Sequence, residues 1–526
     1  MKKQVNIVKA AGIVSIFTLL SRIFGLVRDI VIATIFPKAA TDAFFVAFTV
    51  PNVLRRLLAE GALTISFIPV FTDYLKKDSQ ESLDFVSSAF TVTAVVVSVV
   101  SLIGVLISPL LVWMFAAGFR NDPVKFANTV NLTRIMFPYI LFVSLMALSM
   151  GVLNTLGHFV MPAAAPVFLN LTLIASGISA PFLGRWIGIS PVFILAWGVL
   201  LGGVVQFLVQ LPPMVKRKYR PSFKPNFKHP GVRKVMLLMA PALFGLAIYQ
   251  INVILSRLLA SFLESGANSY LYYSQRLIEF PMGVFAVAIA TAAMPNLSDH
   301  ASEGQLDNLK KTLRSSMELT FFVILPSMVG LLVISIPIVS VFFQRGRFDY
   351  AMTVETSKSL IAFAAGLPAM AIARQVVPAF YAMKDSKTPV ISSTIALIAY
   401  IISGLTLMWP MSHAGLALAI SISAWVNAMT LLFMFRKKTG SLGAAEMLNP
   451  VLKTVLASLL MGAVSWGGCR FGNWQLGGNN IRNVAVLGST VTISGIAYLG
   501  FSIILGMNHG VKILSTVKRK LGLKKS

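Results

Sequence analysis

The stretch FVSSAFTVTAVVVSVVSLIGVLISPLLVWMFAA, residues 85–117, contains no charged side chain. A helix needs about 20 mostly apolar residues to cross the hydrocarbon core of a bilayer, so this stretch alone could span a membrane. Similar runs recur through the 526 residues, of which 56% are hydrophobic and 12% charged. Soluble domains have roughly 25% charged residues. The composition therefore excludes an ordinary soluble enzyme and predicts an all-α polytopic membrane protein.

Apolar runs separated by polar loops predict about fourteen transmembrane helices. The first run follows Lys2 and Lys3, contains Arg22 and Arg28, and shows no Ala-x-Ala cleavage site. We therefore expect a retained first span rather than a signal peptide. The predicted spans are 10–36, 41–74, 85–117, 125–156, 159–183, 190–213, 235–262, 267–297, 313–343, 352–381, 388–410, 413–435, 450–470 and 483–508.

Lysine and arginine are concentrated at the termini and in the even-numbered loops, most densely between Lys216 and Lys234. Cytoplasmic loops carry an excess of these residues, so both termini are predicted to be cytoplasmic. The same excess explains the net charge of +27 as a topology signal, and no nucleic-acid partner is expected.

The two halves of the chain share short patterns at a constant offset. Pro69 and Asp73 end span 2 as Pro295 and Asp299 end span 8, 226 residues later. With six spans per repeat, the halves would share one orientation about an axis along the membrane normal. We predict two six-helix lobes related by this pseudo-two-fold axis, followed by two C-terminal helices. The predicted parts are an N-terminal lobe at 1–215, a basic cytoplasmic linker at 216–234, a C-terminal lobe at 235–437, and spans 13 and 14 with a basic tail at 438–526.

No phosphate-binding GxxxxGK[ST] loop occurs in the sequence, which favours a transporter that does not hydrolyse ATP. Cys469 is the single cysteine and the five histidines are scattered, so neither a metal site nor a cofactor is expected. The energy would come from a coupling cation, Na⁺ or H⁺, or from the membrane potential.

Several arginines lie inside predicted spans, where an ionised side chain costs about 2.5–3.5 kcal/mol at the helix centre. Helix-face pairs such as Arg276 with Glu279 could neutralise some of them, and for any single arginine this interpretation stays open. Spans 1, 2, 7 and 8 together nevertheless hold more arginines than acids. Guanidinium suits bidentate recognition of phosphate, so the excess predicts an anionic ligand such as a phosphate or diphosphate. The arginines of these four spans are Arg22, Arg28, Arg55, Arg56, Arg257 and Arg276.

Four longer strings resemble the MurJ/MviN family of lipid II flippases, which belongs to a larger group of multidrug and oligosaccharide-lipid exporters. The strings are SRIFGLVRD at 21–29, TDAFFVAF at 41–48, PNVLRRLLAEG at 51–61 and YYSQRLIEFP at 272–281. Some members of the family carry Asp where this chain has Gln275, and the sodium site of some members is not recognisable in spans 11 and 12. The coupling ion therefore stays open.

The resemblance implies a bacterial inner-membrane protein that moves lipid II, undecaprenyl-diphosphate-linked disaccharide-pentapeptide, to the outer leaflet by alternating access for peptidoglycan synthesis. It implies a monomer that binds lipid II and interacts with membrane lipids and cell-wall synthesis enzymes. It also implies a groove for the lipid tail at spans 13 and 14. The substrate-binding residues that it implies are Arg22, Arg28, Arg55 and Arg276, supported by Ser21, Asp42, Asn52, Glu60 and Glu279.

Two alternatives remain. An exporter of another lipid-linked oligosaccharide or of drugs would share the architecture, although export of cationic drugs favours an acidic cavity. A membrane-embedded glycosyltransferase or lipid phosphatase would normally show Asp-x-Asp or a His-centred loop, and the sequence contains neither.

Overall fold

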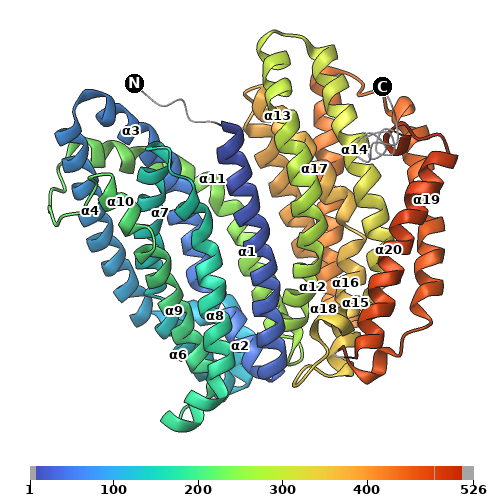
Figure 1. Ribbon diagram of the computed structural model, residues 1–526, viewed down its shortest axis with the longest axis horizontal. Helices are drawn as coiled ribbons and strands as arrows, with labels where there is room; N and C mark the ends of the chain where they lie inside the picture. The colour runs from blue at the N-terminus through green and yellow to red at the C-terminus, as the bar shows by residue number, and fades with distance from the viewer. Residues whose placement is uncertain (1–6, 479, 512–526) are drawn as a thin grey trace. The chain divides into compact units, whose positions relative to one another are not determined.

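The computed structural model describes residues 7–478 and 480–511, and Figure 1 shows their path. The side chains of residues 7–11, 58–60, 62, 79, 240–249 and 444 lie outside the description, as do Lys2, Lys3 and the basic tail after Val511. The described residues form helices and no strands, which confirms the predicted all-α class. The chain divides into two compact units, Met1–Asn268 and Ser269–Ser526.

Several helix–helix contacts hold the first unit together. Helix α8 packs against both α1 and α9, and α2 packs against α6. A buried apolar cluster that includes Val50, Phe115 and Phe137 fills the space beside α11. The helices are α1 (Ile7–Ile35), α2 (Lys38–Leu54), η1 (Arg55–Leu63), α3 (Thr64–Lys77), α4 (Ser79–Leu106), α5 (Ser108–Ala116), η2 (Ala117–Asn121), α6 (Pro123–Met136), α7 (Tyr139–Thr155), α8 (Val160–Ile187), α9 (Pro191–Leu208), α10 (Leu211–Lys216) and α11 (Pro230–Ser261).

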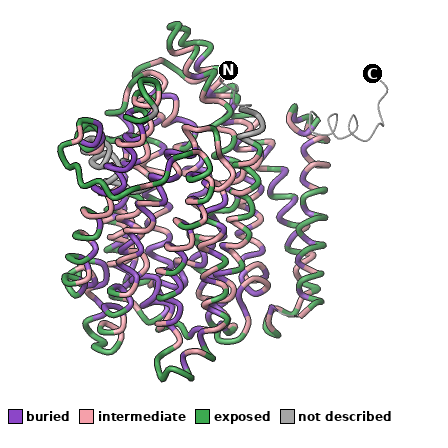
Figure 2. The backbone as a smooth tube through the Cα atoms, turned by 60° about the vertical axis from the view of Figure 1, so that its left-hand side comes forward, coloured by how far each residue is buried: buried purple, intermediate pink, exposed green. Residues whose placement is uncertain are grey.

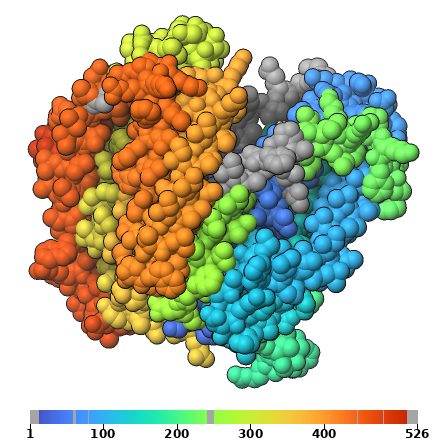
Figure 3. All heavy atoms as spheres, turned by 180° about the vertical axis from the view of Figure 1, so that it is seen from behind, coloured from blue at the N-terminus to red at the C-terminus, as the bar shows by residue number. Residues whose placement is uncertain are grey.

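In the second unit, α14 packs against α13, α17 and α19, and α19 packs against α20. In Figure 3 the residues of this unit run from green through yellow and orange to red. The helices are α12 (Ala267–Pro281), η3 (Met282–Ala286), α13 (Val287–Ser302), α14 (Leu306–Val333), α15 (Ser335–Phe343), α16 (Tyr350–Ala364), α17 (Leu367–Ala382), α18 (Lys387–Thr439), α19 (Ala444–Cys469), η4 (Trp474–Leu476) and α20 (Ile481–Ile504).

The predicted spans correspond to these helices, although several spans are broken into two. Spans 11 and 12 are joined in α18, whose backbone breaks at Ser412 with φ 50° and ψ −136°. Among the described residues, nine helices are long and apolar enough to cross a membrane, or ten if bent α16 and α17 form one span. Helix α1 and the α2–α3 stretch, which carry Arg22, Arg28, Arg55 and Arg56, are outside this set.

Exposed residues, green in Figure 2, include large apolar side chains on many helices. Phe182, Trp186 and Ile504 are 74%, 79% and 79% exposed. Apolar surface of this extent marks an interaction site such as contact with a membrane, as the composition predicts.

Helix α11, the predicted span 7, belongs to the first compact unit, where it packs against η1, α5 and α3. Its Ser261 accepts a hydrogen bond from the backbone N–H of Gly118 at 3.0 Å. The compact units thus divide within α12, at Asn268 and Ser269. The predicted lobe boundaries were drawn from the internal sequence repeat, whereas the compact units are defined by contacts between residues. The lobes and the linker between them therefore stay a prediction.

Both predicted repeats contain a π-helical segment at a related place. Segment η1 follows Pro51 in predicted span 2, and η3 follows Pro281 in predicted span 8. Proline lacks the N–H that an α-helix needs, and π segments occur often at functional sites. Positions 55–63, moved by the offset of 226 residues, would cover all of η3, so the pair supports the predicted duplication.

Candidate functional site

Arg28 lies in α1, and its guanidinium bonds to Asp29 and Asn170. Its Nε and Nη2 donate to Oδ1 of Asp29 at 2.9 and 2.6 Å, and its Nη1 donates to Oδ1 of Asn170 in α8 at 3.1 Å. Arg28 is 6% exposed and Asp29 is fully buried. Removing one partner of a buried ion pair costs about 3–5 kcal/mol, so this arrangement fixes both charges.

Asn170 connects this pair to Ser21, about two turns before Arg28 on α1. Its Nδ2 donates to the backbone oxygen of Ser21 at 3.0 Å and lies 3.5 Å from the Ser21 hydroxyl. Asn170 was not among the residues predicted from the sequence, although an amide between Leu169 and Leu171 in an apolar span is a signal that could have indicated it. Ser21 and Arg22 are both half-buried.

Arg55 begins the π segment η1, and its Nε donates to Oδ1 of Asn52 at 2.9 Å. Asn52 in turn donates from Nδ2 to the backbone oxygen of Phe48 at 3.0 Å. The predicted neighbours Asn52 and Arg55 are thus in contact, with a neutral amide orienting the guanidinium. Arg56 is exposed, and the side chain of Glu60 lies outside the described residues.

Asp42 has a different environment from that of a ligand-binding acid. Its Oδ2 accepts from Nζ of Lys125 in α6 at 2.9 Å and from the backbone N–H of Gly266 at 2.7 Å. Its side chain is 1% exposed, and that of Lys125 is 9% exposed. Asp42 therefore links α2 to α6 and to the chain after α11, and its predicted substrate role stays a prediction.

In the second unit, Arg276 and Glu279 form the predicted helix-face pair on α12. Nη1 of Arg276 donates to Oε2 of Glu279 at 3.0 Å, and the two side chains are 32% and 49% exposed. The guanidinium carbon of Arg276 lies 6.0 Å from the ring centre of Tyr272, within reach of a cation–π interaction. The neighbouring Gln275 is exposed.

A polar cluster that was not predicted from the sequence adjoins the break in α18. The ring of His413 contacts the Ser359 hydroxyl through Nδ1 at 2.6 Å and Glu355 through Nε2 at 3.1 Å. Tyr270 lies against the same ring at 4.9 Å between ring centres. The sequence shows these residues only as isolated polar positions in apolar spans. That they lie together in one cluster depends on the fold.

The predicted site residues thus fall into local groups within each unit. The first unit brings together Ser21 and Arg28 through Asn170, and Asn52 with Arg55, whereas Asp42 lies in a separate ion pair. The second unit holds Arg276 with Glu279. Donors of this kind, charged and preoriented, make short and strong hydrogen bonds to phosphate oxygens.

Residues 31–477 match a protein family described as lipid II flippase MurJ. The chain is 37% identical over 514 residues to a probable lipid II flippase MurJ of Vibrio cholerae, covering 95% of this chain and 97% of that protein. It is 34% identical over 512 residues to lipid II flippase MurJ of Burkholderia cenocepacia, covering 96% and 98%.

Solved structures give the same result. Lipid II flippase MurJ in an inward closed conformation superposes with a TM-score of 0.77 and 30% identity, covering 93% of this chain and 98% of that chain. An inward-facing multidrug MATE transporter of the MOP superfamily, 13% identical, superposes with a TM-score of 0.65, covering 81% and 96%, and shares the fold alone. This chain belongs to the lipid II flippase MurJ family.

Proposed function

We propose that this protein moves lipid II from the cytoplasmic to the outer leaflet of the bacterial inner membrane. The observation that carries the proposal is the burial of Arg28, which is only 6% exposed and lies within helix α1. The chain that holds it belongs to the lipid II flippase family. A buried arginine is costly in a membrane and marks a functional site by default. In this proposal the protein transports lipid II across the membrane without changing its covalent structure.

In the proposed mechanism Arg28, Arg55 and Arg276 bind the diphosphate of lipid II, and Arg22 contributes further positive charge. Ser21, Asn52, Glu60, Glu279 and Asp42 support these arginines. A diphosphate oxygen would compete with Asp29 for the Nε and Nη2 donors of Arg28, since those donors now bond to Asp29. Asp29 would thus be the counter-ion of the empty carrier, which avoids an uncompensated charge in the membrane.

The carrier would then alternate between inward-open and outward-open states, while the isoprenoid tail stays in the bilayer at predicted spans 13 and 14. A bound cation, Na⁺ or H⁺, or the membrane potential would reset it. We further propose that the protein acts as a monomer with both termini cytoplasmic, between enzymes that make lipid II inside and those that consume it outside. The basic loops support this orientation.

The proposal is tested by depleting the protein in its host and measuring lipid II cleavage by an enzyme added outside the cells. Cleavage should collapse while total lipid II accumulates, and wild type should restore it. The Arg28→Ala variant should not restore cleavage, because it loses a charge-assisted hydrogen bond to the diphosphate that is worth about 1.5–3 kcal/mol. Arg185→Ala is the matched control, since Arg185 is exposed in the last turn of α8.

The double variant Arg28→Lys, Arg55→Lys separates charge from geometry. Lysine keeps the charge but loses the planar fork of donors, so translocation should fall about 10- to 100-fold. Full translocation by this variant would contradict the diphosphate role of the two arginines. Unchanged outside cleavage after depletion would instead contradict the proposed function itself.

A further inference from the structure

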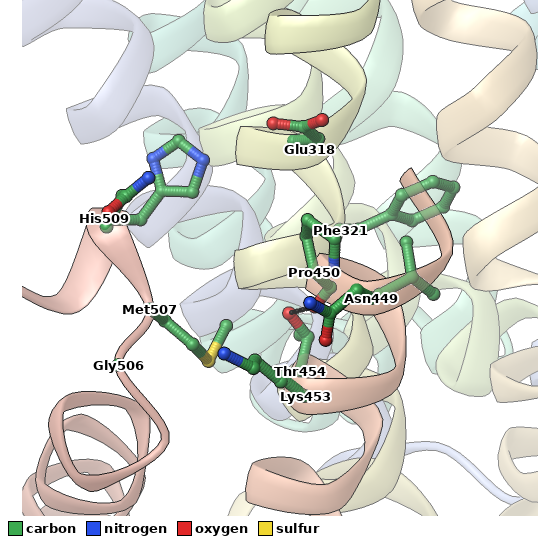
Figure 4. Close-up of a pocket in the computed structure, with 11 residues that line it drawn as sticks. Glu318, Phe321, Asn449, Pro450, Lys453, Thr454, Gly506, Met507 and His509 are labelled. Carbon is green, nitrogen blue, oxygen red and sulfur yellow. Dashed lines mark hydrogen bonds between the residues drawn. The ribbon is translucent and has the colours of Figure 1, made fainter. Parts of the chain in front are cut away.

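A cavity of about 190 Å³ lies in the second unit, between α14, the start of α19 and the chain that follows α20 (Figure 4). It is smaller than the roughly 300–1,000 Å³ of pockets for drug-sized ligands, so it suits a headgroup rather than a whole lipid. Its residues are separate from the arginines of the proposed transport site. The lining side chains used below are Glu318, Phe321, Asn449, Lys453 and Met507.

Two opposite charges border this cavity from different helices. Glu318 belongs to α14 and Lys453 to α19, and Figure 4 shows them on opposite sides of it. Both side chains are half-buried, and neither has an ion-pair or hydrogen-bond partner among the described side chains. Half-buried charges gain much from a ligand that supplies both counter-charges.

The rest of the lining includes apolar and amide side chains, together with the hydroxyl of Thr454 and the imidazole of His509. Phe321 and Met507 are apolar, while Asn449 is exposed one turn before Lys453. Residues three and four apart share a helix face, and this face of α19 continues away from the cavity through leucines. Leu452, Leu456 and Leu460 are 57%, 47% and 40% exposed, so an apolar strip leads from the polar cavity along the helix.

We propose that this cavity binds the headgroup of a phospholipid that carries a primary ammonium group, as in phosphatidylethanolamine. Lys453, with the amide of Asn449, takes the phosphate. Glu318 accepts hydrogen bonds from the ammonium, and the acyl chains lie along the leucines of α19. Charge complementarity selects this occupant, since an anionic headgroup would leave Glu318 unmatched and repelled.

Phosphatidylcholine provides the sharpest comparison, because its trimethylated nitrogen keeps the charge but has no N–H to donate. Phosphatidylglycerol provides the second comparison, because it supplies the phosphate without a cation. The preference should therefore follow the order ethanolamine above choline and glycerol, and Glu318 should be the residue that sets it.

The test measures binding of the three lipids, with identical acyl chains, to the purified full chain by native mass spectrometry in detergent. Wild type should prefer phosphatidylethanolamine about tenfold, as one charge-assisted hydrogen bond allows. Glu318→Gln should remove that preference, and Glu318→Asp should keep it. Lys453→Gln should weaken binding of all three lipids. Lys311→Gln, an exposed lysine of α14 outside the cavity, should change nothing.

Equal binding of the three lipids by wild type would overturn the proposal. So would a wild-type preference for phosphatidylglycerol, which would make the cavity an anion site, or an undiminished preference in Glu318→Gln. Thermal unfolding of each variant checks that it is folded before binding is compared. Lipid II transport is not part of the readout, so failure here leaves the proposed flippase function untouched.

Discussion

Arg28 bonds to Asp29 and Asn170 through all three of its side-chain nitrogens. A buried guanidinium without such partners would carry the full cost of desolvation. Asn170 supplies a neutral acceptor, and it also bonds to the α1 backbone at Ser21. The amide therefore fixes the rotation of Arg28 relative to α8, which makes Asn170 a positioning residue in our proposal.

Replacing Asn170 with leucine should reduce lipid II translocation about 10- to 100-fold. Without the amide, the Arg28 guanidinium would shift by about an ångström and no longer be oriented towards the diphosphate. The matched control is Gln206→Leu, since Gln206 is also a buried amide, donating to the backbone oxygen of Ala165 at 3.1 Å. Both variants should lose about 1–3 kcal/mol of stability. Equal translocation by the two would show that Asn170 only stabilises the fold.

Asp42 and Lys125 allow a second prediction at the level of single residues. Asp42→Asn should destabilise the protein by about 3–5 kcal/mol, since it leaves a buried ammonium unpaired. The double variant Asp42→Asn, Lys125→Gln should regain both thermal stability and translocation if the pair is structural. If Asp42 binds substrate, stability should return without translocation. Thermal unfolding and the outside-cleavage assay together separate these outcomes.

At the scale of elements, Asp385 holds the two ends of α18 together. It accepts from the backbone N–H groups of Lys387 and Thr388 at 3.1 and 3.0 Å and also contacts Lys438. Burial alone would raise the pKa of Asp385, but the bonds from Lys438 and Thr388 outweigh burial and lower the pKa from 3.8 to about 2. The residue is thus a helix cap rather than a free loop acid.

A lowered folded-state pKa means that Asp385 stabilises the protein above about pH 4, and that this contribution is lost as the pH falls towards 2. Asp385→Ala should cost about 1–2 kcal/mol at pH 7, as loss of a helix cap does. The difference from wild type should shrink in thermal unfolding at pH 3 and below. Asp307→Ala should change little, because the Asp307 side chain is 85% exposed.

At the scale of the whole molecule, the predicted topology is open to direct measurement. In a Cys469→Ser background, Ser190→Cys lies in the loop between α8 and α9, and Lys311→Cys near the start of α14. Both positions are exposed. The positive-inside rule places Ser190 outside and Lys311 inside. An impermeant maleimide should therefore label the first variant in intact cells and the second only after permeabilisation, and the reverse pattern would invert the topology.

The sequence by itself determined the helical class, the order of the spans and the presence of arginines inside them. Hydropathy and charge are local properties, and a bilayer requires each apolar run to satisfy its own backbone as a helix. The contact of Asn52 with Arg55 was also within reach, because residues three apart meet on one helix face.

Only the tertiary structure decided which partners the charges have. Asn170 reaches Arg28 across 142 residues, and Lys125 reaches Asp42 across 83. Such pairs depend on how each helix is rotated against its neighbours, and packing rather than local pattern sets that rotation. For the same reason α11 packs with the first unit, and Glu318 borders a cavity with Lys453 that no spacing in the sequence could indicate.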